Sequence, residues 1–257
     1  MGSENFNIEI QDGIARCTMK GPNMNSLSNV MLPALMEGLR SVLDDDGVRV
    51  IVLRGDEGNF CTGADLTTMG DKMDPAALCE GMRAMGAFVY EIHEGPKPVI
   101  AEVDGWAVGG GFGLAMAADI TYATERARFF LSWTKLSILP DFGSAYFLTR
   151  RVGLSIAKEL ALTAAIIDAD EALRIGLINR VVPHEEISDV VMKLAGKLAR
   201  RTPNVLATTK RWLNTGHQVD LQTFLDLEAY SQALAVVTPE HDEAIKEFFA
   251  KRTGSKE

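Results

Sequence analysis

The chain has 257 residues, of which 47% are hydrophobic and 24% are charged, and its formal net charge is −9. This composition is ordinary for a folded globular protein, and the length fits one large domain or one domain with an appendage. The acidic balance argues against nucleic-acid binding through a basic surface. The most apolar stretch, 99–120, is interrupted by Glu102, Asp104 and several glycines, so we expect no membrane span.

Cysteine and histidine usage predicts neither a disulfide framework nor a metal centre. The three cysteines, Cys17, Cys61 and Cys79, are an odd and sparse set, which favours a reducing compartment. No charged and then apolar leader opens the sequence, so we expect a cytoplasmic protein. The 4 histidines are scattered without metal-ligand spacing, and we therefore expect no metal ion and no separate cofactor.

Strand and helix signals alternate through most of the sequence. In chain order we expect a hairpin with strands at 7–10 and 14–19, a helix from Ser28 to about Leu43, a buried strand at 48–53, a helix at about 75–93, a buried strand at 99–103, a short helix at 112–118, and strands at 120–123 and 127–130. From about His184 onward only helical patterns follow, the clearest at 203–214, 220–236 and 239–251. The sequence predicts an α/β core over 1–195 and a helical region over 196–257.

Two glycine-centred loops carry most of the functional information. The first, 58–66, follows the expected strand at 48–53, and the second, 105–115, follows the strand at 99–103. Either loop alone could be a tight strand-to-helix turn. Two such loops that converge can direct unpaired backbone N–H groups at one point. That arrangement is an oxyanion hole, which stabilises negative charge on a carbonyl oxygen.

The triple glycine also resembles a dinucleotide-binding loop, but the spacing does not fit. The pattern G-x-G-x-x-G needs its last glycine at position 114 or 116, where the chain has Leu114 and Met116. Asp119 comes too soon to be the acidic residue of that motif. Walker loops, the G-x-S-x-G elbow and the H-E-x-x-H pair are also absent from the sequence.

Both loops resemble segments of the enoyl-CoA hydratase/isomerase (crotonase) family. Residues 60–66 match its F-C-x-G-A-D-L segment, and residues 105–119 match G-x-A-x-G-G-G-x-x-L-A-x-A-x-D. Residues 97–101 and 174–182 are also similar, so the resemblance covers nearly the whole chain. It implies a spiral of stacked ββα units, an acyl-CoA thioester substrate, and a C-terminal helical region that forms a homotrimer or a dimer of trimers.

Carried over by position, the resemblance implies that the backbone N–H groups of Ala64 and Gly110 are the oxyanion donors. Gly110 has no side chain to block a thioester, and it lies just before a helix N-terminus, where the helix dipole favours an enolate. The predicted substrate-binding residues around these donors are Phe60, Gly63, Asp65, Leu66, Gly109, Gly111, Phe112 and Trp133. Asp65 is also a candidate cap for the turn after Ala64.

The family has a segment near its C-terminus that touches the CoA phosphates bound to a neighbouring subunit. In this chain the segment matches Phe248 and Lys251. An equally good explanation is that Phe248 belongs to a hydrophobic core and that Lys251 is a solvated surface residue.

The acid/base groups separate the members of this family. Its hydratases use two glutamates, which by register would stand at Gly113 and Trp133, and neither residue can transfer a proton. Asp141 is a nearby carboxylate, and isomerases of the family have one acidic residue at this place after a proline. One carboxylate can take a proton from the α carbon and return it two carbons along, while the oxyanion hole holds the dienolate. The resemblance therefore implies an isomerase with Asp141 as its base.

An apolar pocket would strengthen this base, because burial disfavours the charged form of a carboxyl and raises its pKa. The aromatic residues expected around it are Phe60, Phe112, Trp133 and Phe142. Trp133 has an alternative explanation as a core aromatic residue at the end of a strand.

Several alternatives stay open. Asp141 could simply cap the helix that follows it. Trp133 and Asp141 have the spacing of the 4-chlorobenzoyl-CoA dehalogenase of this family, in which the aspartate is a nucleophile, but the histidine base of that enzyme would fall at Gly86. A hydratase with an atypical substrate, or an acyl-CoA-binding protein without catalysis, is also consistent with the two loops.

Overall fold

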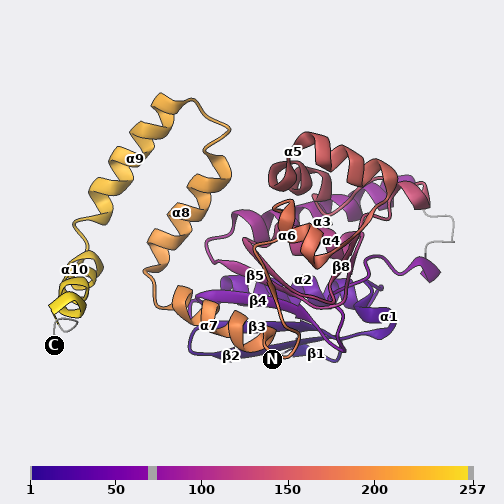
Figure 1. The fold of residues 1–257 in the computed structure, drawn as a ribbon, viewed down its shortest axis with the longest axis horizontal. Helices are drawn as coiled ribbons and strands as arrows, with labels where there is room; N and C mark the ends of the chain where they lie inside the picture. Colours follow the sequence, from indigo (N-terminus) through magenta and orange to yellow (C-terminus); the bar gives the residue numbers. More distant parts are fainter. Residues whose placement is uncertain (1, 69–73, 254–257) are drawn as a thin grey trace. The chain divides into compact units, whose positions relative to one another are not determined.

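The computed structural model describes residues 2–68 and 74–253, and the chain divides into two compact units. The first unit, Met1–Arg200, contains all the strands of the described residues, whereas the second, Arg201–Glu257, is helical (Figure 1). The α/β architecture and the C-terminal helices that the sequence predicts are therefore present. Within the described ranges, no helix is both long and apolar enough to cross a bilayer.

The first unit is built on a large sheet and a small one. Its strands are β1 (Gly2–Ser3), β2 (Phe6–Gln11), β3 (Ile14–Met19), β4 (Val50–Gly55), β5 (Val99–Val103), β6 (Trp106–Val108), β7 (Ile120–Thr124), β8 (Arg128–Phe130), β9 (Ile166–Asp168) and β10 (Arg180–Val182). The large sheet has the order β1-β2-β3-β4-β5-β7-β10, and the small one has the order β6-β8-β9.

Helices connect these strands and cover the sheets. They are α1 (Pro22–Asn25), α2 (Met31–Asp44), α3 (Pro75–Glu94), α4 (Gly110–Ala117), α5 (Ser144–Thr163), α6 (Ala169–Arg174) and α7 (Ile187–Ala199), with the 3₁₀ helices η1 (Leu66–Thr68) and η2 (Thr134–Leu136). From β3 to β10 the neighbouring strands of the large sheet run parallel, as the buried apolar runs predict.

The hairpin at the start of the chain is confirmed. Strands β2 and β3 pair antiparallel, with Gln11 opposite Ile14. The two residues between them, Asp12 and Gly13, have φ values of 52° and 76°. Positive φ at both positions is the requirement of the two-residue turn that matches the twist of a hairpin.

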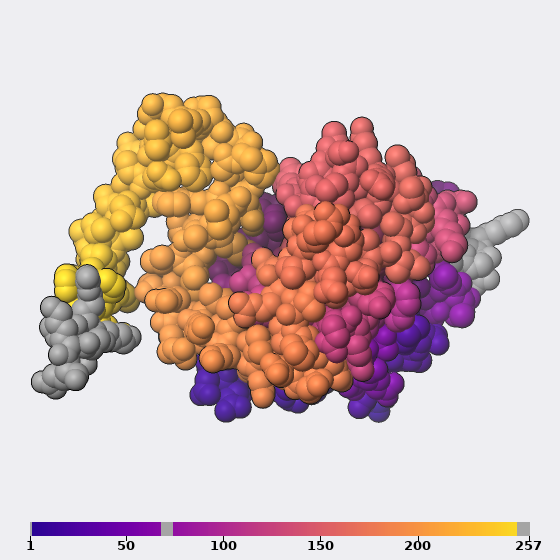
Figure 2. Space-filling view, viewed as in Figure 1, coloured from indigo at the N-terminus to yellow at the C-terminus, as the bar shows by residue number. Residues whose placement is uncertain are grey.

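The large sheet is buried on both faces. Ile51 and Leu53 of β4 belong to the main core cluster, whereas Val50 and Val52 pack with Val191 of α7 in a second cluster. Side chains alternate between faces along a strand, so a strand buried on both sides reads as a continuous apolar run. The chain from α5 to α7, salmon to orange in Figure 2, forms much of the visible surface of the first unit.

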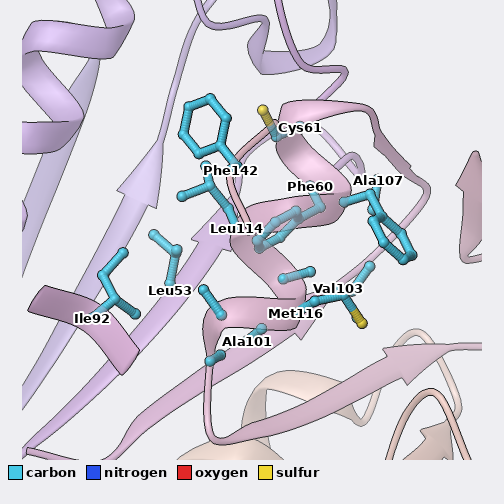
Figure 3. Packing of buried hydrophobic residues seen from close by; sticks show 14 of the residues in the cluster. Leu53, Phe60, Cys61, Ile92, Ala101, Val103, Ala107, Leu114, Met116 and Phe142 are labelled. Atoms are coloured by element: carbon cyan, nitrogen blue, oxygen red, sulfur yellow. The ribbon is translucent and has the colours of Figure 1, made fainter. Parts of the chain in front are cut away.

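Helix α4 is the centre of the main core. All of its residues are buried, and Leu114 and Met116 lie among Leu53, Ala101 and Val103 of the sheet (Figure 3). Small residues and glycines let this helix fit there, because its backbone can approach its neighbours closely. Helix α4, which follows the second glycine loop, is therefore surrounded by packed side chains of the core.

Some boundaries differ from the sequence prediction. Helix α2 begins at Met31 and not directly after Ser28, although the Ser28 hydroxyl does accept a hydrogen bond from the Met31 N–H (3.2 Å). Strand β4 begins at Val50 instead of residue 48, and α4 begins at Gly110 instead of Phe112. Strand β6 lies inside the second glycine loop, where three residues are too few to show periodicity.

The second unit contains α8 (Pro203–Thr215), α9 (Leu221–Ala235) and α10 (Pro239–Thr253). Asp220 caps α9 by accepting a hydrogen bond from the Thr223 N–H (3.0 Å). The Thr238 hydroxyl accepts one from the His241 N–H (3.3 Å) at the start of α10, as the Thr-Pro pair predicts. The structure divides the chain after Arg200, the C-terminal cap of α7.

Candidate active site

The first glycine loop pairs directly with β6, which lies in the second. Cys61 and Ala107 form an isolated parallel bridge. The Cys61 N–H donates a hydrogen bond to the Trp106 carbonyl (2.9 Å), and the Val108 N–H donates one to the Cys61 carbonyl (2.9 Å). The two loops, about fifty residues apart in the chain, therefore converge as the sequence predicts.

Gly63 makes the closest approach between the loops possible. Its φ is 76°, and a Cβ atom there would lie 2.6 Å from the Val108 carbonyl oxygen and 3.0 Å from the Gly110 nitrogen. Only glycine tolerates both this φ and this contact. Its own carbonyl accepts a hydrogen bond from the Leu27 N–H (2.7 Å), which anchors the loop just before Ala64.

The two predicted oxyanion donors are available. Gly110 is the first residue of α4, and the residue before it, Gly109, supplies no side-chain cap. Among the described residues, neither the Gly110 N–H nor the Ala64 N–H donates a hydrogen bond to the protein. Unpaired amides at a helix N-terminus attract negative charge because the helix dipole adds to their own partial charge.

Both amides border one cavity of about 350 Å³. It is lined by Thr62, Ala64, Leu66, Val108, Gly109, Gly110, Phe130, Ser132, Trp133, Lys135, Leu136, Ile138 and Asp141. Most of this lining is apolar, and among the described residues its charged side chains are Lys135 and Asp141. The Lys135 ammonium lies 5.8 Å from the centre of the Phe130 ring. The structure thus brings six predicted site residues, Ala64, Leu66, Gly109, Gly110, Trp133 and Asp141, to one cavity.

Other predicted residues lie beside the cavity without lining it. Phe60 and Phe112 are completely buried, and the Phe112 ring packs edge-on against Trp133, with 5.9 Å between ring centres. They pack behind the cavity wall and are absent from its lining, so their direct contact with substrate stays an untested prediction. Gly63 and Gly111 hold the loops together, because a Cβ at Gly111 would collide with the backbone of Cys61.

Asp65 has a local structural role. Its Oδ1 accepts hydrogen bonds from the Thr67 N–H (3.1 Å) and from the Thr67 hydroxyl (2.7 Å). This is the capping arrangement considered for it, at the start of η1. Asp65 is absent from the cavity lining, so direct contact with substrate is not supported.

Asp141 is held by Trp133. The Trp133 Nε1–H donates a hydrogen bond to Oδ1 of Asp141 (3.0 Å), and Trp133 is itself only 2% exposed. Burial raises the pKa of the Asp141 carboxyl above its ordinary value, and the hydrogen bond from Trp133 opposes part of that shift. A carboxylate with a raised pKa is a stronger base.

The Asp141 side chain does not cap the following helix. Helix α5 begins at Ser144, and the residue at its N-cap position, Gly143, has φ 68° and makes no side-chain cap. It is the main-chain carbonyl of Asp141 that accepts hydrogen bonds, from the Ser144 N–H (2.9 Å) and the Ser144 hydroxyl (2.6 Å). The capping alternative is therefore wrong. The Asp141 side chain lines the cavity instead.

The family model described as enoyl-CoA hydratase/isomerase matches residues 9–255. The chain belongs to this family. It is 35% identical to a crotonyl-CoA hydratase of Syntrophomonas wolfei, over 98% of this chain and 97% of that one. It is 34% identical to a 1,2-epoxyphenylacetyl-CoA isomerase of Escherichia coli, over 95% of both chains.

Solved structures of the enoyl-CoA hydratase/isomerase family have the same fold. One from Cupriavidus metallidurans superimposes with a TM-score of 0.89 at 35% identity, covering 98% of this chain and 95% of that one. The expected crotonase-type spiral of ββα units is thereby confirmed. The relatives include hydratases and an isomerase. Membership of the family therefore establishes an acyl-CoA enzyme, but it does not specify which reaction the enzyme catalyses.

Gly113, where the resemblance implies the first hydratase glutamate, is packed closely by other residues. A Cβ atom at Gly113 would lie 2.5 Å from the Phe142 Cβ and 2.7 Å from the Ser144 hydroxyl. The segment that carries Asp141 therefore packs directly on Gly113 and leaves no space for a side chain there. At Trp133, where the resemblance implies the second glutamate, the indole donates its hydrogen bond to Asp141.

The histidine that the dehalogenase alternative needs is not at this cavity. Gly86 lies in α3 with no atom within 4 Å of a Cβ built on it. His93 packs its ring against Phe147, with 5.0 Å between ring centres. Neither residue lines the cavity, and its lining contains no histidine among the described residues.

The remaining predicted residues are in the second unit. Phe248 is 55% exposed, and its ring contacts Phe249 at 5.7 Å between centres, so it is not a core residue. Lys251 is in the last turns of α10, and its side chain lies outside the described residues.

Sequence reasoning missed part of the cavity wall. Phe130 is the last residue of β8, and Ser132 lies two residues beyond it. Lys135, Leu136 and Ile138 come from η2 and the residues after it. The alternation of Phe130 and Ser132 with the buried Leu131 is a strand signal, and it could have placed both side chains on one face. Residues of a 3₁₀ turn have no comparable pattern.

Proposed function

We propose that the protein shifts the double bond of an enoyl-CoA thioester by moving a proton from the α carbon to the carbon two positions further along. The observation that carries this proposal is the cavity where the Asp141 carboxylate, held by Trp133, faces two unpaired amides. The positions of the two hydratase glutamates hold Gly113 and Trp133. One carboxylate is sufficient for a proton shift, whereas the hydratases of the family use two.

The proposed mechanism assigns each group one task. The Ala64 and Gly110 N–H groups bind the thioester oxygen and stabilise the negative charge that develops there. Trp133 binds Oδ1 of Asp141, so proton transfer falls to Oδ2. Asp141 takes the α proton, the dienolate forms in the apolar cavity, and the same carboxyl returns the proton two carbons along. The raised pKa of Asp141 suits both steps.

A panel of thioesters in deuterated water tests this function. We expect 3-enoyl-CoA to become 2-enoyl-CoA, with deuterium at the exchanging carbons and no addition of water, as read by NMR and mass spectrometry. Rapid hydration of 2-enoyl-CoA with no reaction of 3-enoyl-CoA would contradict the proposal. An acyl-CoA-binding protein without catalysis would show no deuterium exchange at the α position.

The hydrogen bond between Trp133 and Asp141 also suits a second candidate, in which Asp141 attacks an aryl-CoA ring as a nucleophile. That reaction needs a base to activate water in the second step, and the described lining has no histidine for it. A halogenated benzoyl-CoA in the same panel separates the two candidates, because the nucleophilic reaction releases halide.

We further propose that the chain assembles as a trimer or a dimer of trimers, with CoA near a subunit boundary. Large apolar side chains on α8, α9 and the turn after α9 support this. Leu213, Leu221, Tyr230, Leu234 and Val237 are between 71% and 78% exposed. Apolar surface of this extent on a helical unit marks an interaction site.

Sedimentation at micromolar concentration tests the assembly. We expect a trimer or hexamer for the natural chain and a shift to smaller species for Leu234→Glu, because a carboxylate in an apolar interface loses its hydration. Gln232→Glu, which changes charge on an exposed residue of the same helix, is the matched control. A natural chain that sediments as a monomer would contradict the proposal.

A further inference from the structure

Ser132 is a polar residue of the cavity that the proposed mechanism does not use. It lies two residues after the end of β8, lines the cavity, and is only 7% exposed. Of its neighbours in the sequence, Leu131 is fully buried, whereas Trp133 lines the same cavity. The cavity lining therefore includes Ser132 together with Phe130 and Trp133.

The pairing of β6 with β8 places Ser132 beside the second glycine loop. Val108 is opposite Phe130, and the Gly109 N–H donates a hydrogen bond to the Phe130 carbonyl (3.1 Å). Both strands end at this pair, and the chain beyond β8 leads to Ser132. A Cβ atom at Gly109 would lie 3.4 Å from the Ser132 hydroxyl oxygen, so this hydroxyl lies against the residue that precedes the Gly110 amide.

The Ser132 hydroxyl has no hydrogen-bond partner among the described residues, unlike other hydroxyls around the cavity. The Thr62 hydroxyl donates to the Asn23 carbonyl (2.7 Å), and the Ser144 hydroxyl donates to the Asp141 carbonyl (2.6 Å). The Ser132 oxygen is not among the buried side-chain atoms without a partner in the described residues, so it is open to the cavity. Water or a bound ligand in the cavity can therefore take its hydrogen bond.

We propose that Ser132 is a further catalytic residue, whose hydroxyl donates a third hydrogen bond to the thioester oxygen beside the Ala64 and Gly110 amides. The inference rests on the thioester site proposed above, but not on the double-bond shift. The bond strengthens as the oxygen gains charge, because hydrogen bonds to anions are stronger than those to neutral carbonyls. Ser132 then lowers the barrier to enolate formation more than it tightens substrate binding.

The infrared band of the thioester carbonyl reports on this hydrogen bond directly. The probe is a saturated acyl-CoA with ¹³C at the carbonyl, which binds and cannot isomerise. We expect the bound band to move to lower frequency than in water, and Ser132→Ala to reverse part of that shift. Turnover of 3-enoyl-CoA by Ser132→Ala should fall about 10- to 100-fold, with KM little changed.

Two further variants separate hydrogen bonding from packing. Ser132→Cys keeps a side chain of similar size but donates only weakly, so it should behave like Ser132→Ala. Ser41→Ala removes the hydroxyl of an exposed serine on α2, which donates to the Gly38 carbonyl (2.7 Å), and should change neither the band nor the turnover.

The outcomes are distinct. If Ser132→Ala and Ser132→Cys keep the full band shift of the natural protein, the third donor is disproved while the two-amide site stands. If KM rises and the band and kcat stay the same, Ser132 contacts another part of the ligand and the proposal is wrong. If the natural protein itself shows no band shift, the proposed thioester site fails together with this inference.

Discussion

Asp141→Asn is expected to lower the rate of α-proton transfer by about 10³-fold, which is within the range that general-base catalysis contributes. The asparagine side chain has the same shape, and its carbonyl oxygen can still accept the hydrogen bond from Trp133. It cannot accept a proton. The α-deuterium exchange of a bound acyl-CoA, followed by NMR, measures the loss, and CoA affinity should stay close to that of the natural protein.

The stability of Asp141→Asn separates chemistry from structure. The pKa of the Asp141 carboxyl is raised in the folded protein by burial, so its protonated form is favoured there. Such a group contributes stability below its unfolded pKa and loses it as pH rises through the folded pKa. Asp141→Asn should therefore unfold at an equal or higher temperature than the natural protein at neutral pH, and this advantage should disappear in acid.

The pH profile of the natural protein follows from the same shift. The base must be ionised to take the α proton, so kcat/KM should fall as pH drops through the raised pKa of Asp141. The acid limb of the profile should lie above the ordinary aspartate value of 3.8. If Asp141→Asn isomerises 3-enoyl-CoA at the rate of the natural protein, the carboxylate is not the base. A clear drop in the melting temperature of this variant at neutral pH would show that the carboxylate has a structural role.

Gly110→Val is expected to reduce turnover by about 10²-fold or more, which is the scale of losing one oxyanion donor. A Cβ atom at Gly110 would already lie 3.1 Å from the Phe142 ring and 3.2 Å from the Leu27 Cδ1. The two methyl groups of valine add to this crowding, so the start of α4 must move. The Gly110 N–H then no longer lies beside the Ala64 N–H at the thioester oxygen.

The matched control is Gly86→Val, because Gly86 lies in α3 and has no atom within 4 Å of a Cβ built on it. It should leave turnover unchanged. Steady-state kinetics with 3-enoyl-CoA, together with circular dichroism to show that both variants are folded, measures the difference. A folded Gly110→Val protein with the turnover of the natural one would remove Gly110 from the proposed site.

Much of the architecture could be predicted because its signals are local. The apolar run that becomes β4 indicates a strand buried on both faces, and Asp12-Gly13 indicates a hairpin turn. The short strand β6 was missed because three residues show no periodicity, and because its partner, Cys61, is distant in the chain.

The amino-acid sequence by itself determined the family and the two glycine loops, since these depend on residue types at given positions. It could not decide whether Asp141 caps a helix or serves as a base. Tertiary structure excluded the cap, because Trp133 binds the carboxylate while Ser144 binds only the main chain, and the role of Asp141 as a base stays a proposal. It also moved Phe60 and Phe112 behind the cavity wall and brought Ser132 to the second glycine loop. Those outcomes depend on contacts between distant segments, and no local pattern in a sequence records which side chains will meet.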